Sequence, residues 1–179
     1  MAESAWPYPV PYDDGGAAHL TCGLRLPVIA LPSTMGGAID VSAVEGRSVV
    51  FVYPWTGRPG VADPPNWDHI PGAHGSTPQA IGFRDLLPSF AARGVGVFGL
   101  SSVSPEWQGE FTMRNALTYP LLSDEALLFA GAMRLPRFET GGMTFLKRLT
   151  LLCRDGSIED AVYPVHPPDR HAADLLQRL

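Results

Sequence analysis

The sequence is poor in cysteine and has no long apolar stretch, and both shortages narrow the classes of protein it can belong to. Cys22 and Cys153 are the only cysteines in 179 residues, too few for a disulfide framework or a zinc site of their own. No run of about 18 apolar residues occurs, so we expect no membrane span. The first twelve residues have no basic start and are broken by prolines, unlike a secretory signal. We therefore expect a cytoplasmic protein.

Basic residues are also scarce. Thirteen Lys and Arg residues stand against 18 Asp and Glu residues, and the net charge of -5 argues against a general nucleic-acid binder. The sequence contains no dinucleotide-binding glycine motif and no P-loop. Its five histidines lack the spacing of metal ligands. We expect no cofactor and no metal, and a small molecule as the binding partner.

The composition that remains is typical of one folded domain. Hydrophobic residues make up 45% and charged residues 17% of the chain, enough for a core and too few charges for a disordered segment. Nineteen glycines and 18 prolines indicate long ordered loops. We expect an irregular lead-in over residues 1–20 and a single domain over residues 21–179.

Alternating strand and helix patterns predict an α/β fold. The apolar run 48–53 ends at Pro54 and is typical of a strand buried on both faces. A loop of about twenty residues follows, and loops of that length are usually functional. The other predicted elements are a helix from residue 76, a strand at 95–100, helices at 105–116 and 123–133, a loop at 135–143, strands at 146–153 and 157–162 joined at Asp155-Gly156, and a C-terminal helix. This order predicts a thioredoxin-like fold, a central mixed sheet flanked by helices.

The start of the helix at residue 76 has a recognisable pattern. Ser76, Pro78 and Gln79 fit a capping box, in which the serine side chain accepts from the amide three residues later. In a thioredoxin-like fold this helix start meets the loop after the first core strand. The functional site is therefore expected here.

Short segments on both sides of this helix start carry a family resemblance. Gly75-Ser76-Thr77 is followed by Phe83-Arg84-Asp85 and preceded by Tyr53-Pro54, and further segments lie at 98–101, 120–124 and 147–151. Together they resemble peroxiredoxins of the bacterioferritin-comigratory-protein type, in the AhpC/TSA group. The resemblance covers roughly residues 20–179. It implies a thioredoxin fold, an antioxidant oxidoreductase ancestry and a tendency to form homodimers.

One departure from the family decides the chemistry. The resemblance places the peroxidatic cysteine at Ser76 and the resolving cysteine at Ile81. Peroxide reduction needs a thiolate, whose pKa the helix N-terminus and an arginine lower. A serine hydroxyl stays protonated at neutral pH. We therefore expect the chain as written not to turn over peroxides by the family's mechanism.

Three functions remain open for such a chain. The interpretation favoured by the sequence is a cofactor-free enzyme that uses the former peroxide pocket for proton transfer, elimination or cyclisation of a small organic molecule. The second is a thiol-dependent hydroperoxide reductase represented by a Cys-to-Ser variant. The third is a non-catalytic binding protein that keeps the fold.

The candidate site residues surround the helix start. The resemblance implies that Arg148, on the predicted strand 147–151, is the active-site arginine; with Ser76 it would polarise an oxygen atom. His69 and His74 are candidate acid/base groups, although solvated loop histidines are common. The candidate binding residues, each with a structural alternative as a cap or a core residue, are Tyr53, Pro54, Trp55, Trp67, Thr77 and Gln79.

Overall fold

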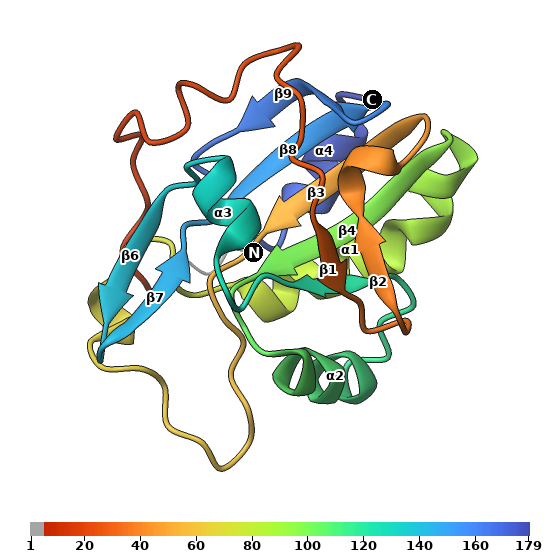
Figure 1. The fold of residues 1–179 in the computed structure, drawn as a ribbon. Helices are drawn as coiled ribbons and strands as arrows, with labels where there is room; N and C mark the ends of the chain where they lie inside the picture. Colours follow the sequence, from red (N-terminus) through yellow and green to blue (C-terminus); the bar gives the residue numbers. More distant parts are fainter. Residues whose placement is uncertain (1–5) are drawn as a thin grey trace, which may run out of the picture.

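The computed structural model describes residues 6–179 and is built on a five-stranded mixed sheet (Figure 1). The strand order is β5-β4-β3-β8-β9. Strands β3, β4 and β5 are parallel, whereas β8 and β9 pair antiparallel. Their bounds are β3 Arg47–Val52, β4 Val95–Ser101, β5 Leu121–Ser123, β8 Leu149–Arg154 and β9 Ser157–Val162. The predicted thioredoxin-like α/β fold is confirmed.

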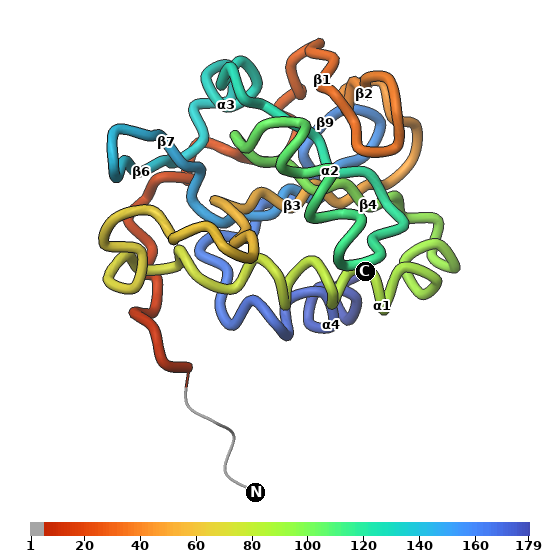
Figure 2. Tube along the Cα trace, turned by 90° about the horizontal axis from the view of Figure 1, so that it is seen from below, coloured from red at the N-terminus to blue at the C-terminus, as the bar shows by residue number. Residues whose placement is uncertain are grey.

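Helices and hairpins cover both faces of this sheet (Figure 2). Helices α1 (Ser76–Ala92) and α4 (His171–Leu176) lie on one face. Helix α3 (Leu128–Ala132) and the hairpin of β1 (Ala30–Pro32) and β2 (Ala38–Asp40) lie on the other. The remaining elements are α2 (Pro105–Arg114) beside β5, the hairpin of β6 (Arg137–Thr140) and β7 (Met143–Leu146), and two 3-10 turns, Val41–Ala43 and Trp67–His69.

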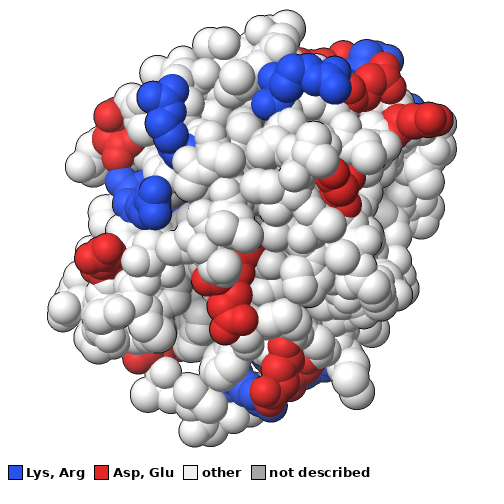
Figure 3. Space-filling model, viewed as in Figure 1, with Lys and Arg blue, Asp and Glu red and all other residues white. Residues whose placement is uncertain are grey.

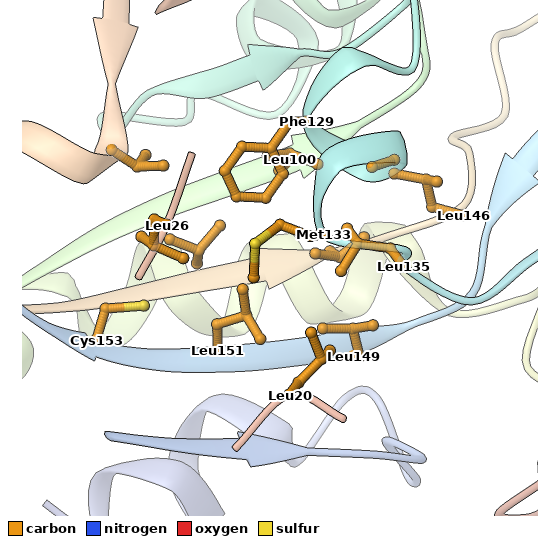
Figure 4. Close-up of a cluster of buried hydrophobic side chains, with 14 of the residues drawn as sticks. Leu20, Leu26, Leu100, Phe129, Met133, Leu135, Leu146, Leu149, Leu151 and Cys153 are labelled. Carbon is orange, nitrogen blue, oxygen red and sulfur yellow. The ribbon is translucent and has the colours of Figure 1, made fainter. Parts of the chain in front are cut away.

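Strand β3 is buried on both faces because its side chains alternate between two cores. Val49 and Phe51 pack with Phe83 of α1, whose ring stacks on Phe51 at a centroid distance of 4.4 Å. Val50 and Val52 belong to the opposite core. Figure 4 shows that second core, where Phe129, Met133 and a group of leucines meet Cys153 of β8. Cys153 is thus a core residue, whereas Cys22 is exposed.

Two segments differ from the elements expected between residues 121 and 146. The predicted loop at 135–143 contains most of the β6–β7 hairpin, because Phe138 and Phe145 both contact Trp67, at centroid distances of 5.7 and 5.0 Å. The predicted helix at 123–133 is shorter, and β5 occupies its beginning. The Asp124 carboxylate accepts hydrogen bonds from the amides of Phe129 and Ala130 at 3.1 and 2.8 Å, so the helix starts later.

The surface and the helix lengths are unremarkable for a small domain. Figure 3 shows acidic and basic side chains interspersed on the face it presents. Among residues 6–179, no helix has the length and the apolar character needed to cross a membrane.

Candidate functional site

Strand pairing brings Arg148 to the end of β3. Val52, the last residue of β3, pairs with Leu149, the first residue of β8. Arg148 immediately precedes that residue and therefore lies at the carboxyl end of β3, next to the loop that leads into α1. The predicted strand 146–153, which includes Arg148, is corrected here, because β8 begins only at Leu149 and Arg148 belongs to the connection before it.

Ser76 is the first residue of α1, and Gly75 is its N-cap. The predicted capping box is therefore wrong: no side chain caps this helix, and the Gln79 amide donates to the carbonyl oxygen of Gly75 at 3.1 Å. Gly75 has a φ of 107°, and a Cβ atom there would lie 2.2 Å from Cγ of Pro168. Only glycine therefore fits at position 75, and it takes the N-cap position. Because Ser76 does not cap the helix, its side chain can turn toward Arg148.

The Arg148 guanidinium collects several acceptors around Ser76. Its Nη2 atom donates to Oγ of Ser76 at 3.1 Å and to the carbonyl oxygen of His74 at 3.1 Å. Longer contacts of 3.4 Å reach the carbonyl oxygens of Gly72 and Ala73. Its Nη1 atom donates to Oε1 of Gln79. The guanidinium thus holds the end of the loop and the start of α1 in one fixed arrangement.

This arginine is buried without a carboxylate partner. Arg148 is 3% exposed, and burial lowers its pKa to about 9, so it is still cationic at neutral pH. Among residues 6–179, no Asp or Glu forms an ion pair with it. A buried charge that is surrounded only by neutral acceptors is unfavourable, and such a site favours an anion at its open side. Ser76, which accepts from the guanidinium, lines the cavity described below, while Arg148 itself lines a second pocket with Pro11, Ile70 and Tyr163.

Gln79 acts on Arg148 rather than on a ligand. Its side chain is fully buried, with Oε1 bonded to the guanidinium. The Nε2 atom of Gln79 and the Nε atom of Arg148 are buried without a partner among the described residues. Gln79 therefore orients the arginine from below, which differs from the predicted role as a binding or capping residue.

A cavity of about 320 Å³ opens in front of Ser76. Thr77 lines it beside Ser76, and His74 lies at its edge. The indole rings of Trp55 and Trp67, 5.5 Å apart and steeply inclined, form part of its wall. The structure thus brings together five of the residues predicted from the sequence.

His74 forms a polar cluster at the mouth of this cavity. Its Nε2 atom lies 2.7 Å from Oδ1 of Asp68, and Asp63 also lines the cavity. Among the described residues, Asp63, Asp68 and His74 form the one group whose ligand atoms lie close enough, within 4.8 Å, to hold a metal ion. Both aspartates are exposed. The Asp68–His74 pair can also accept or deliver a proton at the cavity edge.

Three predicted residues lie away from the cavity. Tyr53 is buried, and its hydroxyl accepts from Nε2 of Gln108 at 3.0 Å; burial raises its pKa well above the ordinary value. Pro54 is buried after β3, and His69 is exposed in the 3-10 turn. None of the three lines the cavity, and the roles predicted for them, binding for Tyr53 and Pro54 and acid/base catalysis for His69, stay predictions.

Sequence reasoning missed two aromatic residues of the cavity wall. Trp6 and Tyr8 line it from the N-terminal segment, which was expected only as a lead-in. The sequence does contain a pattern that could have indicated this role, because Trp6 and Tyr8 alternate with Pro7 and Pro9. An extended segment with an aromatic side chain at every second position can present these side chains to one surface.

Fold and site together define a thioredoxin-like protein in which the start of α1 faces a buried arginine. The Redoxin family matches residues 21–177 of the sequence. A peroxiredoxin-type relative of Mycobacterium tuberculosis (strain ATCC 25618 / H37Rv) is 35% identical over 107 residues, which are 59% of each chain. A bcp peroxiredoxin homologue of Coxiella burnetii is 27% identical over 165 residues, 88% of this chain and 97% of the relative.

A solved structure extends this likeness to the whole fold. Peroxidoxin BcpB from Mycobacterium tuberculosis superposes with a TM-score of 0.71 at 26% identity, covering 89% of this chain and 96% of that one. The chain belongs to the Redoxin family, and its relatives and structural neighbours include peroxiredoxins of the Bcp type. The resemblance predicted from its short motifs is confirmed.

Proposed function

We propose that this site is that of a thiol-dependent hydroperoxide reductase in which serine occupies the position of the reactive cysteine. The observation that carries the proposal is the buried Arg148 guanidinium, which has no ion-pair partner among residues 6–179 and lies 3.1 Å from Oγ of Ser76. A thiolate at this position would supply the missing negative charge. Serine cannot do so at neutral pH, so the chain binds a hydroperoxide oxygen without reducing it.

The surroundings of Ser76 suit the thiolate in two further ways. The first-turn amides of α1 point their positive dipole end at this side chain. The same donors can stabilise the oxygen that leaves when the O–O bond breaks. Both effects act on negative charge, and both are weak partners for a neutral hydroxyl.

The experiment is the substitution Ser76→Cys. We expect the introduced thiolate to attack the terminal oxygen of a hydroperoxide, so that an S–O bond forms, the O–O bond breaks, and the alkoxide takes up a proton to leave as the alcohol. The resulting sulfenic acid is reduced by two equivalents of added dithiothreitol thiol, with release of water. The measurement is hydroperoxide consumption with and without dithiothreitol.

A matched control keeps this test specific. Thr77→Cys places a thiol in the same cavity one residue further on, where no contact to Arg148 exists. We expect turnover in Ser76→Cys and none above the native protein in Thr77→Cys. If the two variants reduce peroxide equally, or neither does, the site is not the one proposed.

A second candidate is the cofactor-free catalyst predicted from the sequence. The Asp68–His74 pair beside Ser76 supports it, because such a pair can move a proton at the cavity edge. The relatives found by comparison favour the peroxidase interpretation instead. An inactive Ser76→Cys protein that still binds small oxygen-bearing molecules in this cavity would favour the second candidate function.

A further inference from the structure

The N-terminal segment, residues 6–11, is an addition to the family domain that reaches the Ser76 cavity. The family match begins only at residue 21. Trp6 and Tyr8 nevertheless line the cavity together with Ser76 and Thr77. In Figure 2 this segment, in red, runs beside the yellow loop that carries Trp67 and His74. The cavity is therefore completed by residues that lie outside the matched domain.

Several contacts hold this segment in place. The Tyr8 ring stacks on the His74 ring at a centroid distance of 3.6 Å and an angle of 12°. The Gly72 amide donates to the carbonyl oxygen of Pro9 at 3.3 Å. The Trp6 ring packs edge-on against His166 at 5.9 Å. Three prolines, at positions 7, 9 and 11, restrict the backbone further, so little conformational entropy is lost on docking.

A second anchor lies just beyond the segment. The Asp14 carboxylate accepts from Nζ of Lys147 and from the hydroxyl of Tyr163, both at 2.6 Å. These hydrogen bonds, from Lys147 first, hold the pKa of Asp14 well below its usual range. Lys147 is the neighbour of Arg148 in the chain. The N-terminal segment is therefore tied to the same connection between β7 and β8 that carries Arg148.

The segment changes what the cavity can hold. Trp6, Tyr8, Trp55 and Trp67 give it four aromatic side chains, while Ser76 and Thr77 supply hydroxyl groups at one end. A volume of about 320 Å³ is in the range of pockets that bind small organic ligands. Hydrogen peroxide would leave most of this space unfilled. A ligand with a ring would fill it and stack on the aromatic wall.

We propose that residues 6–11 form a selecting wall, which makes the cavity specific for an organic hydroperoxide with an aromatic body. The part of this inference that concerns the peroxide group of the ligand rests on the proposed function. The aromatic end rests on the rings of Trp6 and Tyr8 alone. The oxygen end faces Ser76, and the ring lies against Trp6 and Tyr8, whose own rings contact each other edge to face at a centroid distance of 5.8 Å.

The test compares ligands that share a head group. Cumene hydroperoxide and tert-butyl hydroperoxide carry the same tertiary peroxide, and only the first has a ring. Binding to the native protein is followed by tryptophan fluorescence and calorimetry, where no turnover interferes. We expect cumene hydroperoxide to bind about tenfold more tightly, because stacking on two rings accounts for a difference of that size.

Variants of the wall decide whether the segment is the cause. We expect Trp6→Leu combined with Tyr8→Leu, which keeps apolar bulk and removes the rings, to reduce the preference to about twofold or less. Tyr12→Ala is the matched control, because Tyr12 is 71% exposed and does not line this cavity. Unchanged thermal unfolding of each variant shows that the fold is intact. A preference that survives the double variant, or that is absent from the native protein, overturns the inference.

The same measurement separates this inference from the proposed function. The alcohol 2-phenyl-2-propanol has the ring without the peroxide, and its aliphatic counterpart is tert-butanol. If Ser76→Cys fails to reduce peroxides but the phenyl alcohol still binds more tightly through Trp6 and Tyr8, the proposed function fails and the selecting wall stands. If Ser76→Cys is active without any aromatic preference, the reverse holds.

Discussion

The floor and the wall of the cavity are built in different ways. The floor, formed by Ser76, Gln79 and Arg148, sits at the ends of β3, β8 and α1 and is buried. The wall, formed by the rings of Trp6, Tyr8, Trp55 and Trp67, comes from loop segments and one 3-10 turn, and of the four residues only Trp67 is buried. The ends of regular elements thus position the charge that acts on an oxygen atom, and the segments of the wall select the molecule that carries that atom. Changes to the floor should alter chemistry and stability, whereas changes to the wall should alter selection.

The largest effect is expected from the arginine of the floor. In the Ser76→Cys background, Arg148→Met removes the charge that lowers the thiol pKa and stabilises the leaving oxygen. We expect the rate of peroxide reduction to fall about 10²- to 10³-fold, as when one oxyanion donor is removed elsewhere, and the pKa of the thiol to rise. Reduction rates and the ultraviolet absorbance of the thiolate against pH measure both.

The control for this change lies on the neighbouring strand. Arg154, at the far end of β8, pairs with Glu159 at 2.6 Å and its side chain is 52% exposed. Arg154→Met should leave both the rate and the thiol pKa unchanged. An equal loss in the two variants would mean that net charge, rather than the position of Arg148, controls the site.

The next effect concerns the support beneath the floor. His171 of α4 is 6% exposed, and its Nε2 atom lies 2.8 Å from Oγ1 of Thr150 on β8. Burial, together with the positive charge of Arg148, lowers the pKa of His171 to about 4. Because the folded-state pKa lies below the ordinary 6.5, the neutral His171 side chain makes its full contribution to the free energy of unfolding above pH 6.5. That contribution is lost as the pH falls toward 4.

Chemical denaturation at a series of pH values tests this support. The free energy of unfolding should decrease by up to about 3 kcal/mol between pH 6.5 and pH 4 through this one group. His171→Gln should remove most of that slope, while the same change at the exposed His69 should retain it. A slope that is identical in all three proteins would exclude His171 as its source.

The two regions also differ in how far the sequence predicts them. The core strands could be predicted because a buried strand has a strong local pattern, whereas the pairing of Ser76 with Arg148, 72 positions apart, was implied only by the family resemblance. The helix cap was misassigned because Gly75, held against Pro168, replaces the serine as N-cap. Trp6 and Tyr8 were missed because only docking against His74 and His166, far along the chain, gives their segment a position.

The smallest effect is expected from the anchor of the wall. Asp14→Asn breaks the ion pair with Lys147. Both side chains of this pair are partly exposed, so the free energy of unfolding should change by less than about 1 kcal/mol. Ligand selection should respond more than stability does. The preference for cumene over tert-butyl hydroperoxide should fall by about half, because the segment loses one anchor and keeps its contacts to Gly72 and His74.

Since the pKa of Asp14 is lowered in the folded protein, the anchor is present above the ordinary Asp pKa and is lost only in strong acid. Measured at pH 5, the native protein should therefore already have lost part of its His171-dependent stability while keeping its full aromatic preference. Loss of both properties together over that interval would show that floor and wall are one unit.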